Sequence, residues 1–288
     1  MKITKTGMTI AAASFVLAAC AAPGGTTVPQ MTRVNYYPQC YQSVGQLRQE
    51  DQQFQQTMAV NTIGGALTGA ALGGLISGNW RGAALGAVAG GVTAATATYA
   101  AARAQEADDE RRRQLIANDL SHDSSEMQRA VLAARQADNC YGYAYAQLVA
   151  GMRRGAISKP EAAQRFAEID QGEHEVAAIL AQYGKKSMAS REQYQAAFDQ
   201  EAQRLNTTPN QLLADAGSPP PASSSHTRAA APAPRATAPV SQNTRQLAQN
   251  YNRLNQQVSE INQEQSTIEH TATARRNDMQ GLGVEVPS

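Results

Sequence analysis

The three cysteines have the most distinctive chemical setting in this 288-residue sequence. Cys20 comes at the end of an apolar run from Met8 to Ala19, and two lysines, Lys2 and Lys5, precede that run. A basic start, a short apolar stretch and small residues before the cleavage point are typical of a secretory signal peptide. Cleavage before Cys20 leaves its thiol on the first residue of the mature chain, where it can take a covalent modification.

The run Leu17-Ala18-Ala19-Cys20 resembles the lipobox of bacterial lipoproteins. This resemblance implies that a diacylglycerol and an acyl chain become attached to Cys20, and we expect no other cofactor. Several chains anchor a protein durably, whereas one chain does so only marginally. Residue 21 is not the Asp that favours inner-membrane retention, so the resemblance implies a lipid-anchored, mostly periplasmic protein of the outer membrane. An ordinary signal peptide with a chance cysteine is the alternative.

The other two cysteines, Cys40 and Cys140, remain in the exported chain, where a pair usually forms a disulfide. Helix lengths make this pairing difficult. Cys40 would lie about 58 Å from a turn near Asn79, whereas an unbroken return helix would carry Cys140 about 92 Å away. The bond therefore requires the chain to reverse near Ser121–Ser125, and pairing between two chains is the alternative.

The histidines give little sign of a catalytic or metal site. They are far apart, and no two have the spacing of metal ligands: His122, His174, His226 and His270. The cluster Glu173-His174-Glu175 lies on consecutive helical positions that point to different sides, which favours a solvated face. The sequence has no Gly-x-Ser-x-Gly, phosphate-loop or Cys-x-x-Cys motif. We therefore expect no catalytic residues, no metal and no enzyme activity.

A glycine repeat marks residues 58–102. Two triplets recur at intervals of four residues: Gly65, Gly69 and Gly73, then Gly82, Gly86 and Gly90. Each triplet lies on one helix face, where the missing side chains let two backbones approach closely. With the lipobox, this repeat resembles the glycine-zipper domain of bacterial outer-membrane lipoproteins and surface antigens. The resemblance covers only these two parts of the chain and implies membrane-associated self-packing, and hence a homo-oligomer.

The zipper has two charge-free runs, 59–77 and 82–102, joined by a turn at Gly78–Arg81. At 1.5 Å per residue, each run reaches roughly 28–32 Å, about the thickness of the hydrocarbon layer. A two-helix membrane hairpin is therefore geometrically possible. The alternative is a soluble, tightly packed hairpin, because Ala, Gly and Thr supply little insertion energy.

Apolar residues at helical spacing flank the zipper. Before it, with Asp51 interrupting, they are Val44, Leu47, Phe54 and Met58; after it, they are Ile116, Leu120, Met127, Val131 and Ala134. This spacing predicts one long helical hairpin over residues 40–120. The charge-dense run from Glu106 to Arg113 suits either a lipid headgroup layer or a solvated helix face.

A helical bundle is predicted over residues 121–216. Ser121–Ser125 offers several N-cap candidates, and Ser158 is a plausible N-cap with Pro160 in the first turn that follows. Two further stretches, Lys159–Tyr183 and Ser190–Leu205, carry apolar or small residues at helical spacing. The segment 217–240 is rich in Pro, Ala and Ser, which predicts a disordered linker.

The region 241–276 carries a heptad repeat. Its core positions alternate steps of four and three residues: Leu247, Tyr251, Leu254, Val258, Ile261, Gln265, Ile268 and Ala272. This spacing predicts a coiled-coil helix in which Gln265 is a polar core position that specifies register. The helix either pairs with another chain or packs back onto the bundle. The last residues, 277–288, are predicted to be a disordered tail.

These features predict an all-α protein with a signal peptide at 1–19 and an N-terminal tether at 20–39. With 25 Lys+Arg against 24 Asp+Glu, and 5% aromatic residues, the chain has neither a field for nucleic acid nor a large globular core. We expect membrane lipid, a second copy of the chain and an envelope protein as partners. The predicted function is a structural or interaction lipoprotein of the outer membrane. A pore or an accessory subunit of an envelope export machine is the alternative.

Overall fold

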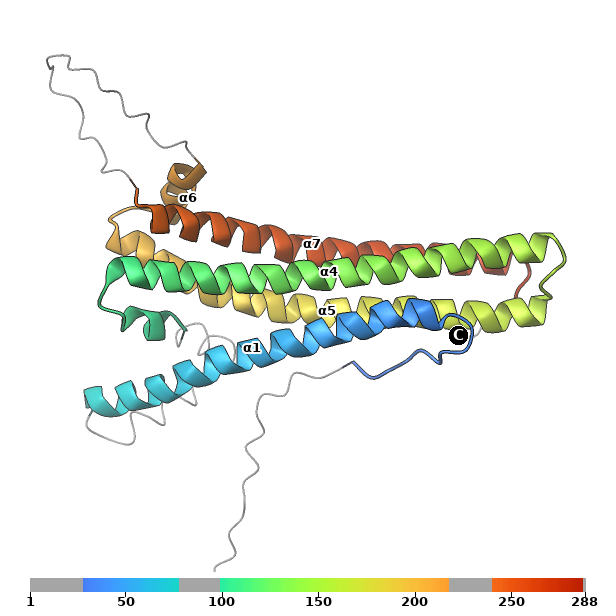
Figure 1. Ribbon diagram of the computed structural model, residues 1–288, viewed down its shortest axis with the longest axis horizontal. Helices are drawn as coiled ribbons and strands as arrows, with labels where there is room; N and C mark the ends of the chain where they lie inside the picture. The colour runs from blue at the N-terminus through green and yellow to red at the C-terminus, as the bar shows by residue number, and fades with distance from the viewer. Residues whose placement is uncertain (1–27, 78–98, 218–239, 287–288) are drawn as a thin grey trace, which may run out of the picture.

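The computed structural model describes residues 28–77, 99–217 and 240–286, with the backbone alone for 58–77. As the sequence predicts, the fold is all-α, and the described residues contain no strand (Figure 1). A helical stretch at 99–104 precedes the second long helix. The helices with defined bounds are α1 Pro38–Ser77, α4 Asp109–Arg153, α5 Lys159–Arg204, α6 Pro209–Gly217 and α7 Gln242–Gly281.

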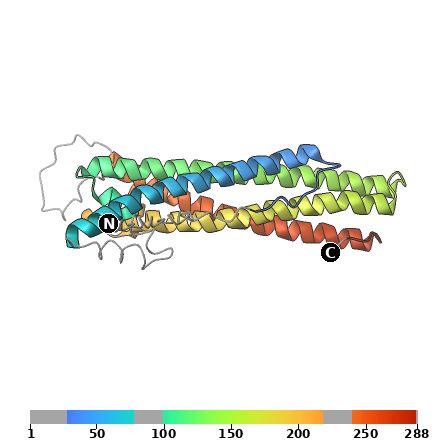
Figure 2. The same cartoon turned by 90° about the horizontal axis from the view of Figure 1, so that it is seen from below.

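Helices α4 and α5 form a central antiparallel pair. They have 45 and 46 residues, so each is about 68 Å long. Helix α7 lies along one side of this pair and α1 along the opposite side (Figure 1). The second view shows the same elongated assembly, with α1 running against the direction of α4 (Figure 2). Among the described residues, none of the helices is both long enough and apolar enough to span a bilayer.

The starts of both central helices follow from their sequences. The Asp108 side chain caps α4 by accepting a hydrogen bond from the Arg111 backbone N–H at 2.9 Å. Ser158 is the N-cap residue of α5, with Pro160 in the first turn, as the sequence predicts. Gly155 has a φ of 70° in the turn between the two helices, a conformation that glycine adopts without steric cost.

The predicted breaks inside the central helices are wrong. Helix α4 continues through Ser121–Ser125, because Asp123 there accepts a hydrogen bond from Ser190 of α5 instead of capping a helix. The chain reverses earlier, in the non-helical residues 105–108. Helix α5 likewise continues past Tyr183. Gly184 permits the close approach of α7, since a Cβ added there would lie 2.9 Å from the Asn262 side-chain oxygen.

The heptad helix packs back onto the bundle instead of pairing with another chain. It lies in the groove between α4 and α5, and the ring of Tyr251 stacks on Phe198 with centroids 4.5 Å apart. Gln265 is not a core position, because its side chain donates to Glu269 of the same helix at 3.0 Å. The remaining predicted heptad positions are buried: Leu247, Tyr251, Leu254, Val258, Ile261, Ile268 and Ala272. The predicted bundle and coiled-coil segments therefore share one core.

The apolar stripe that opens α1 is buried as predicted. Val44, Leu47 and Phe54 face the α4–α5 pair, and the Phe54 ring stacks on Tyr183 with centroids 4.8 Å apart. The side chain of Met58, the fourth predicted member, lies outside the described residues. Asp51 interrupts this stripe without leaving an unpaired charge, because Lys186 of α5 donates to its carboxylate at 2.9 and 3.0 Å. The stripe after the zipper is also buried: Ile116, Leu120, Met127, Val131 and Ala134.

Candidate functional site

Residues 28–37, part of the predicted N-terminal tether at 20–39, are bound along the bundle, and we call this segment the strap. It lies beside the start of α1 (Figure 1) and is held chiefly by two side chains of α5, Glu168 and Glu175. These glutamates are seven residues apart, so they lie on one face of the helix. The strap is therefore a bound part of the fold that connects the predicted lipidation site with the bundle.

Glu175 is fully buried and is the most heavily bonded side chain of this site. Its carboxylate accepts hydrogen bonds from the backbone N–H groups of Met31 at 2.8 Å and Thr32 at 2.7 Å, and from the Thr32 hydroxyl at 2.8 Å. Tyr41 donates to it at 3.1 Å, and Arg48 forms an ion pair with it. Burial acts to raise the pKa of Glu175, but the bonds from Arg48, Thr32 and Met31 together hold this pKa below its usual range.

Glu168 holds the end of the strap that leads into α1. Its carboxylate accepts three consecutive backbone N–H bonds, from Asn35 at 2.9 Å, Tyr36 at 2.7 Å and Tyr37 at 2.8 Å. The guanidinium of Arg165 lies over the Tyr36 ring, 5.3 Å from its centroid. The two glutamates thus satisfy five backbone donors that have no place in a regular helix.

A disulfide fastens the start of α1 to α4, one turn from the end of the strap. It joins Cys40 to Cys140, with the Cα atoms 5.3 Å apart. The expected difficulty in helix length does not arise, because α1 and α4 run antiparallel and the chain reverses ahead of α4. Their register is marked by the ion pair between Glu50 and Arg129 at 3.0 Å.

The charge-dense run from Glu106 to Arg113 is divided between surface and core. Asp109, Glu110 and Arg111 are exposed, as a solvated face predicts, whereas Arg112 and Arg113 are buried and both pair with the buried Glu201 at the end of α5. The expected solvated face at Glu173-His174-Glu175 is wrong. Glu173 is buried and forms an ion pair with Arg275 of α7. In both places, charged residues join helices across the core.

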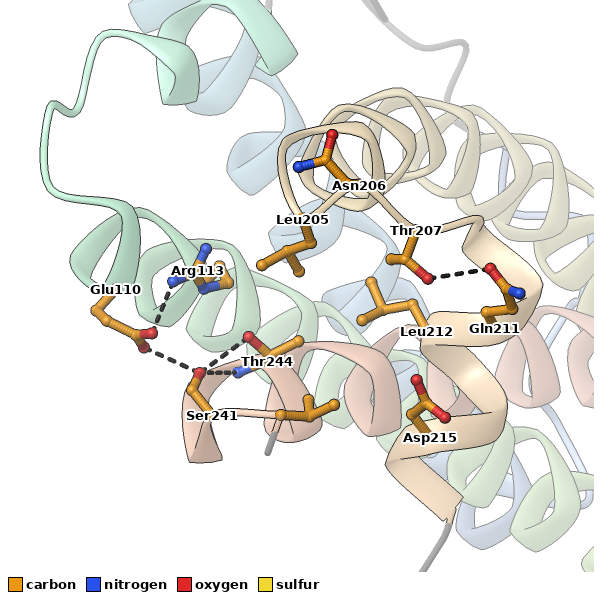
Figure 3. A pocket seen from close by; sticks show the side chains of 11 residues that line it. Glu110, Arg113, Leu205, Asn206, Thr207, Gln211, Leu212, Asp215, Ser241 and Thr244 are labelled. Atoms are coloured by element: carbon orange, nitrogen blue, oxygen red, sulfur yellow. Dashed lines mark hydrogen bonds and ion pairs between the residues drawn. The ribbon is translucent and has the colours of Figure 1, made fainter. Parts of the chain in front are cut away.

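A cavity of about 620 Å³ lies at the end of the bundle where α4 begins (Figure 3). Its wall includes Glu110, Ser241 and Asp215, from three different helices or their caps. The Glu110 carboxylate accepts from Arg113 at 2.7 Å and from the Ser241 hydroxyl at 3.2 Å. The Glu110 carboxylate is thus already paired with Arg113 and Ser241 in the wall of the cavity.

The structure describes only part of the predicted self-association site. Gly65, Gly69 and Gly73 lie within α1. The second triplet, Gly82, Gly86 and Gly90, lies outside the described residues. So do the lipidation residue Cys20, the predicted signal peptide and almost all of the predicted linker.

The structure also brings together a group that spacing between histidines did not predict. His122, Asp123 and Glu126 offer one nitrogen and two carboxylate oxygens that all lie within 4.8 Å of one another. The signal in the sequence was a histidine and a carboxylate four residues apart on one helix. Glu168 and Glu175 were missed because their partners are backbone groups of the strap, which carry no sequence pattern. No protein-family model, curated protein or solved structure matches this chain.

Proposed function

We propose that this protein is a structural lipoprotein of the bacterial outer membrane that associates with itself through its glycine zipper and presents a rigid helical rod to an envelope partner. The observation that carries the proposal is the position of the strap relative to Cys20. Val28, where the bound strap begins, comes only eight residues after Cys20. A fully extended chain of that length spans at most about 29 Å. A lipid on Cys20 thus keeps the side of the bundle close to the membrane surface.

The internal chemistry of the bundle supports a mechanical role. Ion pairs connect its helices along their length, between Arg48 and Glu175, Lys186 and Asp51, and Arg276 and Asp170. With the disulfide, these contacts fix the strap, α1 and the central pair to one another. A rod stiffened in this way transmits a pull on its anchor to the whole bundle.

The anchor is tested by replacing Cys20 with Ser in a Gram-negative host. The wild type should incorporate labelled palmitate and sediment with the outer membrane, whereas Cys20→Ser should take up no label and stay in the soluble periplasmic fraction. Helicity and the non-reducing gel mobility given by the Cys40–Cys140 bond serve as controls for folding. A Cys20→Ser protein that still sediments and resists a carbonate wash would show that the zipper, not the lipid, anchors the protein.

Self-association is tested by filling the zipper faces. Replacing Gly69 and Gly86 by Leu keeps both runs apolar but forces apart backbones that glycine allows to touch. The double variant should remain bound to the membrane and lose crosslinked oligomers. Gly45→Leu is the matched control, because Gly45 is on the same helix, outside the zipper, with no atom within 4 Å of an added Cβ. Oligomers that survive the double substitution would exclude the zipper as the contact surface.

A further inference from the structure

A cluster of three side chains on α4 lies outside the strap and the zipper. His122 Nδ1 is 3.9 Å from Asp123 Oδ1 and 3.8 Å from Glu126 Oε1. Ligands bound at about 2.0–2.2 Å around a tetrahedral ion lie about 3.3–3.6 Å apart. Small side-chain rotations would therefore bring these three groups around a single ion.

Each carboxylate of this cluster has one buried oxygen without a hydrogen-bond partner among the described residues. Asp123 is only 2% exposed and Glu126 only 4%. Asp123 Oδ2 accepts hydrogen bonds from Ser190 at 2.7 Å and Tyr194 at 3.1 Å. Asp123 Oδ1 and Glu126 Oε2 accept none from the described part of the chain. A buried carboxylate oxygen without a partner is costly, and a bound cation removes that cost.

The charges around the cluster leave a deficit of positive charge. On α1, Glu50 is paired with Arg129 at 3.0 Å and Asp51 with Lys186 at 2.9 Å. The Arg129 guanidinium stays 3.9 Å from the Glu126 carboxylate, too far for a hydrogen bond.

The two carboxylates of the cluster are thus without a full counter-charge, and a divalent cation would supply one.

We propose that His122, Asp123 and Glu126 bind a divalent transition-metal ion of the Zn²⁺ class. An imidazole nitrogen with two carboxylate oxygens suits Zn²⁺ or Co²⁺ better than Ca²⁺ or Mg²⁺, which favour oxygen ligands alone. The His122 ring is 59% exposed, so an ion enters from the surface and the ring closes over it. Three protein ligands leave one coordination position for water or for a group of a binding partner.

Titration of the full mature chain with Co²⁺, after removal of metal by a chelator, tests the site directly. Wild type should develop the visible absorption of tetrahedral Co²⁺ at one equivalent and lose it when Zn²⁺ is added. At free Zn²⁺ about 100 times its dissociation constant, the melting temperature should rise by about 5–10 °C. No cobalt spectrum, or no thermal shift, would overturn the proposal.

The variants separate this site from other histidines. His122→Ala should bind Zn²⁺ at least about tenfold more weakly. His174→Ala is the matched control, because His174 also has a carboxylate four residues away, Asp170, but Arg276 already neutralises that carboxylate at 2.6 Å. It should bind Zn²⁺ as wild type does. Full affinity in His122→Ala, or an equal loss in His174→Ala, would place the ion elsewhere and overturn the proposal.

A second substitution keeps the test independent of folding. Asp123→Asn retains an oxygen that can accept from Ser190 and Tyr194, so the variant should fold. It should nevertheless lose the cobalt spectrum and the thermal shift with Zn²⁺. If it folds and keeps both, Asp123 is not a ligand and the proposed site is wrong.

Discussion

Two buried carboxylates on the central helices, Glu175 of α5 and Asp123 of α4, differ in what surrounds them. The Glu175 carboxylate is fully hydrogen-bonded by the strap, Tyr41 and Arg48, and its pKa lies below the usual range. Asp123 has one oxygen bonded and the other without a partner among the described residues, and its pKa is raised to about 6. Burial alone therefore does not decide the role of a carboxylate. A carboxylate whose oxygens are all hydrogen-bonded joins segments of the chain to one another. A carboxylate with an unpartnered oxygen is available to bind an ion.

The largest effect should come from breaking the covalent bond beside the strap. The Cys40–Cys140 bond closes a loop with a sequence separation of 100, for which chain entropy predicts about 4–5 kcal/mol of stabilisation. Cys40→Ala should therefore lower the free energy of unfolding by about 2–5 kcal/mol in denaturant titrations. Cys20→Ser, which removes a cysteine outside this bond, is the control and should unfold as wild type does. Equal stability of the oxidised and reduced wild type would contradict this prediction.

Removal of the Glu175 carboxylate should have the next largest effect on stability. Glu175→Ala leaves Arg48 and the strap donors without their acceptor, which should cost about 3 kcal/mol. The strap should also detach, so trypsin should cleave after Arg33 much faster than in wild type. Glu161→Ala, which removes a half-exposed partner of Arg165 on the same helix, should change stability by less than about 0.5 kcal/mol. Slow cleavage at Arg33 in Glu175→Ala would show that the bonds from Glu168, and from Arg48 to the Val28 and Pro29 carbonyls, are enough to hold the strap.

Removal of the negative charge of Asp123 should change the stability in the opposite direction. In the presence of a chelator, Asp123→Asn removes a buried charge while keeping an acceptor for Ser190 and Tyr194. We expect the variant to be more stable than wild type by about 1–2 kcal/mol near pH 8, measured by urea unfolding. Destabilisation of that size would mean that the ionised carboxylate is satisfied, and the contrast with Glu175 would fail.

The smallest expected effect is the loss of stability at low pH, where protonation of Glu175 weakens its bonds to the strap. The native pKa of Glu175 is depressed, so the native protein binds this proton less readily than the unfolded chain does. Its contribution to stability is complete above the unfolded value near 4.5 and is lost as the pH falls through the native value. Circular dichroism in urea between pH 6 and pH 3 should show a steeper loss of stability in wild type than in Glu175→Gln. Parallel curves would remove Glu175 from the acid response.

The sequence predicts burial well and partners poorly. The spacing of Leu254 and Ile261 on α7, like that of Leu47 and Phe54 on α1, identifies their buried faces because helical periodicity records which side of a helix avoids water. The same heptad spacing suits a helix of the same chain or of another chain, so it did not indicate that α7 fills the groove between α4 and α5.

The continuity of the central helices and the bound position of the strap were harder to predict for other reasons. Asp123 and its neighbouring serines resemble N-cap residues, but a polar side chain that bonds to an adjacent helix has the same sequence signature as a cap. The strap has no hydrophobic period, since its backbone N–H groups make most of its contacts with Glu168 and Glu175. The distance argument against the disulfide failed because it assumed an unbroken helix after Asn79.

Helix α7 follows α4 and α5 in the chain, and this order has a consequence for biogenesis. Its 40 residues cover the seam between α4 and α5, yet they are synthesised after both of those helices. Until they arrive, Phe198 and the other seam residues have no cover, and the unfinished chain is open to chaperones and proteases. A product truncated before Gln242 is therefore expected to be degraded instead of accumulating as a stable fragment. Packing of α7 onto this seam thereby distinguishes chains that extend through Gly281 from chains that stop before Gln242.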